Sequence, residues 1–272
     1  MQARLGGADG LRALERTVRD AAAAAARVIV AGAARRHELV WDAKAPTDFV
    51  SEVDHGAEAA ARDILERFTL PGVPSRLMAE EGSPELQIGD GVTFVLDPLD
   101  GTTNFLHGFP WYCVSLAALV DGELAVGVVH HAAGGGVFAA SLGAGARHRG
   151  RRIQVTGNAD PARALIGTGV PFKKAEQLPA YLPQLDRIAR LTAGVRRPGS
   201  AALDLCDVAR GVFDAFWELE HAPWDMAAGT LIAREAGALV TDLAGRPAPI
   251  AHGPVVAGPP AMHAWLLAQL NA

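Results

Sequence analysis

The sequence predicts a mixed α/β protein in which helices cover β-sheets, and three observations support this fold class. Apolar residues recur at helical spacing near the N-terminus, from Leu11 to Ile29. Apolar runs separated by glycine turns follow between residues 92 and 155, which indicates a meander of strands. From residue 159 onward, strand-like and helical segments alternate. We therefore expect one domain over residues 1–272, with an α+β half at 1–158 and an α/β half at 159–272.

Composition narrows the class of protein. The chain has 272 residues, of which 50% are hydrophobic, so it can bury a sizeable core. Its net charge of −5 and pI of about 6.0 argue against a nucleic-acid surface driven by bulk charge, but they leave room for a local basic patch. Cys113 and Cys206 are too few for a disulfide framework and suit a reducing compartment, so we expect a cytoplasmic protein. Charged residues interrupt the apolar N-terminal run, and we expect no membrane span.

In the first half, helices are expected over residues 11–29 and from about 54 to 68. The polar segment 42–50 between them is expected to be a loop or hairpin, with Lys44 either in solvent or on a lid over an anionic substrate. Ser51 and Asp54 form a capping pattern that explains Asp54 locally as a first-turn carboxylate. The expected extended segments, with glycine turns at 134–136 and 143–145, are 77–79, 92–96, 111–120, 123–129, 136–140 and 153–155.

The second half is expected to begin with a strand over 164–170 and a helix over 178–191. Val195 starts a short strand, and Ser200 caps a helix that runs to 209. A strand over 212–219 leads to a helix that starts at Pro223 and ends at Gly237. A strand near 255–257 and a helix starting near Pro260 close the chain.

The segment 97–103 carries the clearest chemical signal. It follows the buried run 92–96, so Asp97 and Asp100 fall on a tight turn at the end of a strand. Pro98 fixes its own φ and Gly101 permits the bend, which leaves the Leu99 carbonyl free to bind a metal ion. If a helix starts after Gly101, its first amides can bind an anion. The same residues also form ordinary turns, so other segments of the chain have to show whether this turn is a metal and anion site.

Two further acidic positions join this set. Glu80 is the member of the Glu80-Glu81 pair that we expect to face the site, because side chains alternate along an extended chain. Asp225 lies in the first turn of the helix that starts at Pro223, where the helix dipole alone would also favour it. An acidic set without a matching His or Cys cluster suits magnesium rather than zinc.

Four ordered segments, 47–54, 79–81, 97–105 and 224–229, resemble the signature motifs of the inositol monophosphatase family, and the likeness covers nearly the whole chain. This family belongs to the magnesium-dependent, lithium-sensitive phosphatases. The resemblance implies a layered αβαβα sandwich, usually dimeric, that hydrolyses phosphate monoesters without a phosphoenzyme. Ala79 stands where the family often has glycine, but this departure removes no ligand.

The resemblance also implies a set of magnesium ligands: Glu80, Asp97, the Leu99 carbonyl, Asp100 and Asp225. The first three would hold one ion, and Asp97, Asp100 and Asp225 a second. Asp54 would reach a further, looser ion through water. Glu80 and Thr102 would orient and deprotonate a metal-bound water, so Glu80, Thr102 and Asp54 form the implied catalytic set.

The same resemblance implies the substrate contacts. The amides of Gly101 and Thr102 would bind the phosphate group, beside Asp100 and Asp225. Ser200, Ala201 and Glu218 would meet the alcohol part of the substrate, with Glu218 accepting hydrogen bonds from its hydroxyl groups.

The sequence is thus interpreted as a cytoplasmic, homodimeric phosphatase that uses Mg²⁺ and hydrolyses a small phosphate monoester, with myo-inositol monophosphate as the favoured substrate. The segment 107–110 after the central motif resembles the inositol branch of the family. Two alternatives stay open. One is a sister phosphatase for histidinol phosphate or 3′-phosphoadenosine 5′-phosphate. The other is a family member with a non-catalytic role that binds transcription machinery or RNA.

Overall fold

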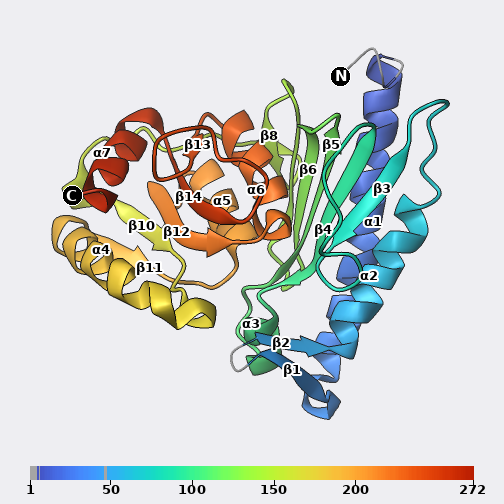
Figure 1. Ribbon diagram of the computed structural model, residues 1–272, viewed down its shortest axis with the longest axis horizontal. Coiled ribbons are helices and arrows are strands. Elements are labelled where there is room, and N and C mark those ends of the chain that lie inside the picture. The colour runs from blue at the N-terminus through green and yellow to red at the C-terminus, as the bar shows by residue number, and fades with distance from the viewer. Residues whose placement is uncertain (1–4, 6, 46–47) are drawn as a thin grey trace.

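The computed structural model describes residues 5, 7–45 and 48–272, which form five alternating layers of helices and sheets (Figure 1). One outer layer holds α1 (Ala8–Ala34) and α2 (Glu52–Leu65). The central layer, between the two large sheets, holds α5 (Ala201–Ala209) and α6 (Pro223–Glu235). The other outer layer holds α4 (Leu178–Leu191) and α7 (Pro260–Leu270). The predicted αβαβα sandwich is thereby confirmed.

The segment between α1 and α2 is a hairpin of β1 (Trp41–Ala45) and β2 (Asp48–Ser51), after one 3-10 turn, Arg36–Glu38. α2 begins two residues earlier than the sequence predicts, because Ser51 is its N-cap: Ser51 Oγ accepts from Val53 N at 3.2 Å. The side chain of Lys44 and residues 46–47 lie outside the described residues, so the lid predicted for Lys44 is not placed.

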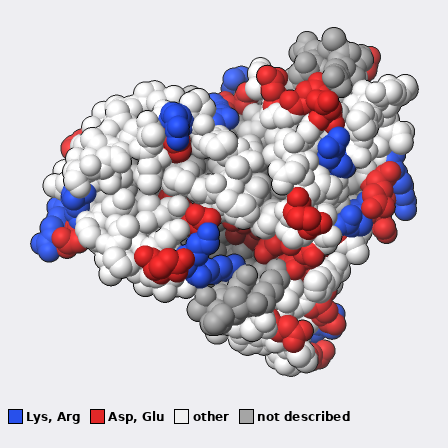
Figure 2. Space-filling model, in the orientation of Figure 1, with Lys and Arg blue, Asp and Glu red and all other residues white. Residues whose placement is uncertain are grey.

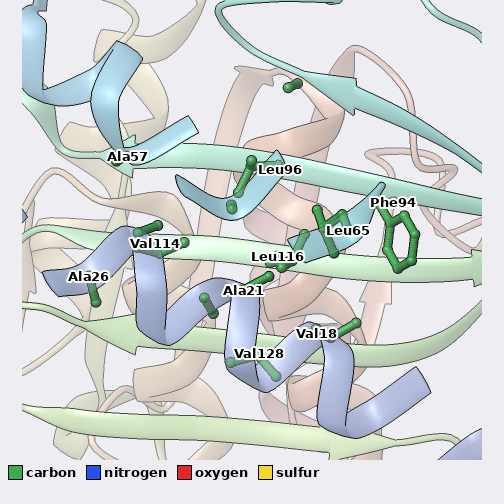
Figure 3. Packing of buried hydrophobic residues seen from close by; sticks show 14 of the residues in the cluster. Val18, Ala21, Ala26, Ala57, Leu65, Phe94, Leu96, Val114, Leu116 and Val128 are labelled. Atoms are coloured by element: carbon green, nitrogen blue, oxygen red, sulfur yellow. The ribbon is translucent and has the colours of Figure 1, made fainter. Parts of the chain in front are cut away.

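The larger sheet has the strand order β3-β4-β5-β6-β7-β8-β9, in which only β3 and β4 are parallel. Its strands are β3 (Ser75–Ala79), β4 (Val92–Asp100), β5 (Cys113–Val120), β6 (Glu123–His131), β7 (Gly136–Ser141), β8 (Ala146–His148) and β9 (Arg151–Arg152). Helices cover both faces, so every residue of β4 and β5 is buried. Figure 3 shows Val18 and Ala21 of α1 lying over Leu116 and Val128 of this sheet.

The smaller sheet has the order β11-β10-β12-β14-β13. Its strands are β10 (Leu165–Thr168), β11 (Gly194–Arg196), β12 (Ala215–His221), β13 (Leu239–Thr241) and β14 (Gly253–Gly258). The sequence did not predict β13. The short α3 (Thr102–His107) and two 3-10 turns, Pro161–Arg163 and Phe172–Gln177, complete the elements.

Two predicted strand segments are wrong. Residues 153–155 form no strand; instead Val155 N donates to Ala236 O at 3.1 Å, after the end of α6. The segment 212–214 is a turn before β12, because the amides of Val212 and Phe213 both donate to Asp207 O, at 2.9 and 3.1 Å. Each segment makes one backbone hydrogen bond to a strand, Ile153 N to Ala146 O of β8 at 3.0 Å and Asp214 N to Leu165 O of β10 at 2.8 Å, but neither bond continues into a ladder.

The two halves share a core. One cluster of buried residues includes Val95 and Phe138 from the larger sheet, Leu205 from α5 and Leu231 from α6. Helix α6 approaches β6 so closely that a Cβ on Gly127 would lie 2.8 Å from Ala228 O. This packing brings the N-termini of α5 and α6 to the end of β4. No helix in the described part of the chain is long and apolar enough to cross a bilayer.

Candidate active site

A cavity of about 370 Å³ lies where the two halves meet. In Figure 2, acidic and basic atoms meet around a hollow near the middle of the visible face. All residues that the sequence analysis assigned to the site line this cavity, except Asp54: Glu80, Asp97, Leu99, Asp100, Gly101, Thr102, Ser200, Ala201, Glu218 and Asp225. The fold therefore brings together residues that are more than 140 positions apart in the chain.

Glu80 and Asp97 are neighbours because β3 and β4 run parallel. Ala79 pairs with Leu96, and Glu80 N donates to Leu96 O at 3.2 Å. Both acids therefore emerge at the same edge of the larger sheet. Glu80 lines the cavity, whereas Glu81 does not, and Glu81 N donates to Glu58 Oε2 at 3.1 Å.

The turn after Asp97 is a bulge at the end of β4. Asp97 Oδ1 accepts from Leu99 N at 2.9 Å, which fixes the carboxylate beside its own backbone. Gly101 has φ +88°, and a Cβ there would lie 2.8 Å from Trp111 O, so both its backbone conformation and its surroundings require glycine. Helix α3 starts directly after Gly101, which meets the condition that the sequence analysis set for an anion site, because the first amides of a helix lack intrahelical acceptors.

Asp54 stands behind this turn and not in the cavity. It is 1% exposed, and its Oδ2 accepts from Ser51 N and Ser51 Oγ at 2.8 and 2.7 Å. Its Oδ1 accepts from Thr102 Oγ1 at 3.0 Å, and the same hydroxyl lies 2.9 Å from Leu99 O. Asp54 is thus connected to the cavity through the side chain of Thr102.

The second half contributes carboxylates held by helix N-termini. Asp225 is the third residue of α6, and its Oδ2 accepts from Ala222 N at 2.7 Å. Asp100 Oδ2 reaches across to α5, where it accepts from Ser200 Oγ at 2.6 Å and Ala202 N at 2.9 Å. Ser200 also caps α5, since its Oγ accepts from Leu203 N at 3.4 Å. The Ser200 hydroxyl, expected to meet the substrate alcohol, is therefore directed at Asp100.

Burial and mutual repulsion raise the pKa values of these acids. Burial holds the pKa of Asp97 well above its ordinary value, and the charges of Glu80, Asp100 and Asp225 add to the rise. Burial, with the Asp225 charge, raises the pKa of Asp100 to about 7 against the hydrogen bond from Ser200. A cation held among such carboxylates would relieve this repulsion.

Glu218 stands at the other end of the cavity, on β12. Burial raises its pKa to about 8, helped by the charges of Asp225 and Asp100. Gly169 makes room for it, because a Cβ on Gly169 would lie 2.1 Å from the Glu218 carboxyl carbon. At neutral pH such a carboxyl group can donate as well as accept hydrogen bonds.

The donor set fits magnesium in its chemistry, since carboxylate and carbonyl oxygens are the ligands that this ion prefers. The charge of Asp225 raises the pKa of Asp97, so these two acids lie near each other. Across residues 5, 7–45 and 48–272, however, no three acidic, histidine or cysteine side chains lie close enough to hold a metal as they stand. The two-ion arrangement stays a prediction.

The sequence analysis missed the basic wall of the cavity, formed by Lys173, Lys174 and Arg197. Burial raises the pKa values of Asp100, Glu218 and Asp225, and the positive charge of Lys173 opposes that rise. The guanidinium carbon of Arg197 lies 4.5 Å from the centre of the Phe172 ring. The sequence did contain a signal for this basic wall, namely two pairs of basic residues: 173–174 after a predicted strand and 196–197 before a capped helix.

Asp204 of α5 is a further missed acid on the cavity wall. It is 2% exposed, and Trp111 Nε1 donates to its Oδ1 at 3.3 Å. Burial and the Glu218 charge hold its pKa well above the ordinary value. The position of Asp204 in its predicted helix did not distinguish it from an aspartate on the protein surface.

Comparisons with known proteins agree with this geometry. The family model described as the inositol monophosphatase family matches residues 12–272. A Rhizobium meliloti protein named inositol-1-monophosphatase is 42% identical over 216 residues, which cover 79% of this chain and 80% of that protein. A Neisseria meningitidis protein named putative Nus factor SuhB is 38% identical over 252 residues, covering 93% of this chain and 95% of that protein.

The solved structure of inositol monophosphatase from Anabaena is similar throughout. It has a TM-score of 0.84 and 32% sequence identity, and the match covers 96% of each chain. The five-layer arrangement is therefore that of a known fold.

Proposed function

Because the chain belongs to the inositol monophosphatase family, a family of phosphatases, we propose that it is a magnesium-dependent phosphomonoesterase acting on myo-inositol monophosphate. One observation carries the proposal. Glu80, Asp97, Asp100 and Asp225 line one cavity, and burial and mutual charge raise the pKa values of the three aspartates. This arrangement suits a site that neutralises its carboxylates with a divalent cation.

In this proposal the residues that would hold magnesium are Glu80, Asp97, Leu99 through its carbonyl, Asp100 and Asp225. When bound, magnesium supplies charge neutralisation and lowers the pKa of a coordinated water. Glu80 accepts the proton of the attacking water, and the Thr102 hydroxyl is kept in place by Asp54 and Leu99 O. Phosphoryl transfer asks mainly for positioning and charge neutralisation, and these residues provide both without a covalent nucleophile.

The alcohol end of the proposed substrate lies toward β12. Glu218 offers its carboxyl group to substrate hydroxyls, and Ala201 forms the wall beside it. Lys173 and Arg197 add positive charge near Glu218, where both oppose the rise in its pKa, and this charge favours an anionic substrate overall. A polyol phosphate supplies both the anionic group and the hydroxyl groups that this lining can bind.

The test is phosphate release from inositol 1-phosphate, histidinol phosphate, 3′-phosphoadenosine 5′-phosphate and fructose 1,6-bisphosphate, with magnesium and with a chelator. We expect magnesium-dependent release with a preference for inositol 1-phosphate. A preference for another ester would keep the mechanism and replace the substrate. No release from any ester would contradict the proposed activity.

The names of several relatives favour a second role. The Neisseria meningitidis relative is named as a putative Nus factor, and a Pseudomonas aeruginosa relative, 40% identical over 243 residues, as a Nus factor. We propose that any transcription role of this chain uses its outer surface and not its catalytic cavity. In cells that depend on the protein, Asp97→Asn should then preserve the phenotype while losing phosphatase turnover. Loss of both would assign the phenotype to catalysis.

Three further expectations belong to the same proposal. The resemblance implies a homodimer, which sedimentation would detect, and inhibition by lithium, which the phosphate-release assay would detect. The free, buried Cys113 and Cys206 support a reducing compartment such as the cytoplasm. The buried cluster drawn from both halves supports one domain over the whole chain.

A further inference from the structure

The side chain of Asn104 joins the two halves of the protein at the edge of the cavity. Its Nδ2 lies 2.7 Å from Trp111 O, 2.9 Å from Pro198 O and 3.2 Å from Gly199 O. Three carbonyl oxygens around one atom fix the orientation of the amide, because only its NH₂ group can donate to them. Its two protons therefore link the loop before β5 to the loop before α5.

Each of these loops supports a different part of the site. On one side, Trp111 O is the atom that would clash with a Cβ on Gly101, so it packs directly against the turn that follows Asp97. On the other side, Pro198 and Gly199 immediately precede Ser200, the N-cap of α5. Asn104 itself lies two residues after Thr102 in α3. One amide thus connects the expected phosphate end of the cavity to its expected alcohol end.

We infer that Asn104 is a positioning residue, which holds the first turn of α5 in register with the 97–102 turn so that the alcohol end of the cavity keeps its shape. Other links at this point are Asp100, which accepts from Ser200 Oγ and Ala202 N, and Trp111 Nε1, which donates to Asp204 Oδ1 of α5 at 3.3 Å. Asp100 is a carboxylate and a proposed magnesium ligand, so the strength of its bonds depends on its charge state. The Asn104 amide is neutral, so the strength of its hydrogen bonds does not depend on a charge state of its own.

The Gly199 backbone strengthens this reasoning. Gly199 has φ +96°, in the left-handed region, and a Cβ there would lie 3.2 Å from Asn104 Nδ2. The nearest group to that Cβ would be Arg197 Nη1 at 2.6 Å, so the loop packs closely against the side chains of both Arg197 and Asn104. Without the amide, Pro198 O and Gly199 O lose their common donor, and the 197–200 loop gains freedom exactly where α5 begins.

The test compares Asn104→Ala with a matched control, Asn271→Ala. Asn271 Nδ2 also bridges two carbonyls, Leu243 O at 3.0 Å and Leu267 O at 2.9 Å, but it does not line the cavity. Hydrogen exchange of residues 199–205 is measured by mass spectrometry with and without magnesium. We expect about tenfold faster exchange in Asn104→Ala in both conditions and wild-type exchange of this segment in Asn271→Ala.

The kinetic readout rests on the proposed function. For inositol 1-phosphate, KM should rise about fivefold to tenfold in Asn104→Ala, while kcat changes less than KM. For glycerol 2-phosphate, whose shorter alcohol reaches less of α5, the rise in KM should be smaller. A residue that only stabilised the fold would lower the melting temperature without separating the two substrates.

Each outcome decides a different point. Unchanged exchange of residues 199–205 in folded Asn104→Ala, or an equal KM rise for both esters, overturns the inference. If the wild type hydrolyses neither ester, the proposed function fails, and the exchange measurement still decides the role of Asn104. If Asn104→Ala does not fold, Asn104→Ser, which keeps a single short donor, takes its place with the same expected direction of change.

Discussion

Replacing Thr102 by valine removes one hydroxyl and keeps the shape of the side chain. In the structure this hydroxyl donates toward Asp54 Oδ1 at 3.0 Å and Leu99 O at 2.9 Å. Asp54 is 1% exposed, so water cannot readily replace the lost donor. Leaving a buried carboxylate oxygen without its partner costs about 1–3 kcal/mol. Thr102→Val should therefore lower the free energy of unfolding by about that amount.

Two assays measure the consequence. Urea denaturation at pH 7 gives the change in the free energy of unfolding, and a thermal melt should move down by roughly 2–4 °C for each kcal/mol lost. Phosphate release should fall by about 100-fold or more, because the proposed mechanism uses this hydroxyl to orient the attacking water. Thr102→Ser keeps the hydroxyl and should stay within a few-fold of wild-type turnover.

The pair of variants also shows how the reasoning could fail. Wild-type stability in Thr102→Val would mean that Asp54 does not depend on the hydroxyl. Wild-type turnover in Thr102→Val would remove Thr102 from the proposed mechanism. If Thr102→Ser loses as much stability as Thr102→Val, the methyl group rather than the hydroxyl supports the turn.

Three other predictions follow from the site and its packing. Asp97→Asn and Asp225→Asn should each lower turnover by about 100-fold or more and weaken magnesium binding in calorimetry, and near-normal values in either variant would contradict the ligand assignment. The folded-state pKa values of Asp100 and Glu218, about 7 and about 8, lie above their ordinary values, so the unfolded chain loses these protons first. Urea denaturation in the presence of a chelator measures this effect. The free energy of unfolding that these two groups contribute should be fully present below about pH 4 and should fall as the pH rises to 8. A free energy of unfolding that does not change over this pH range would refute the prediction. Gly127→Val should lower the free energy of unfolding by about 1–3 kcal/mol, because the new Cβ would meet Ala228 O. Gly157→Ala, which adds a Cβ in open space, should change the free energy of unfolding little. Equal effects of the two variants would contradict this packing.

The sequence by itself determined features that depend on neighbouring residues. Ser51 and Asp54 predict the capping box of α2, because such a box needs only four consecutive residues, although the helix itself begins at Glu52, two residues before the expected start. Gly101 predicts the bend before α3, because a positive φ favours glycine wherever the turn occurs in the fold. Glu80, the member of the pair expected to face the site, lines the cavity and Glu81 does not, although both lie in the turn after β3 and not in an extended chain.

The resemblance to a known family supplied what local patterns could not. Spacing alone gives no reason for Glu80, Asp97 and Asp225 to meet, since they belong to three different elements. The ordered motifs predicted both the five layers and the acids at one site. The cavity contains these acids, and the metal arrangement that the resemblance implies awaits the calorimetric test.

Only the tertiary structure decided which apolar runs pair as strands and which contacts cross between the halves. Residues 153–155 have a strand-like composition, but Ile153 N makes one bond to Ala146 O of β8 while Val155 N donates to Ala236 O after α6, so no strand ladder forms. Asn104 meets carbonyls 94 and 95 residues further along the chain, and Lys173 reaches carboxylates of both halves. Short-range steric effects and hydrogen bonds depend on residues that are neighbours in the sequence. Contacts between the two halves form only after both sheets have packed on the same pair of helices.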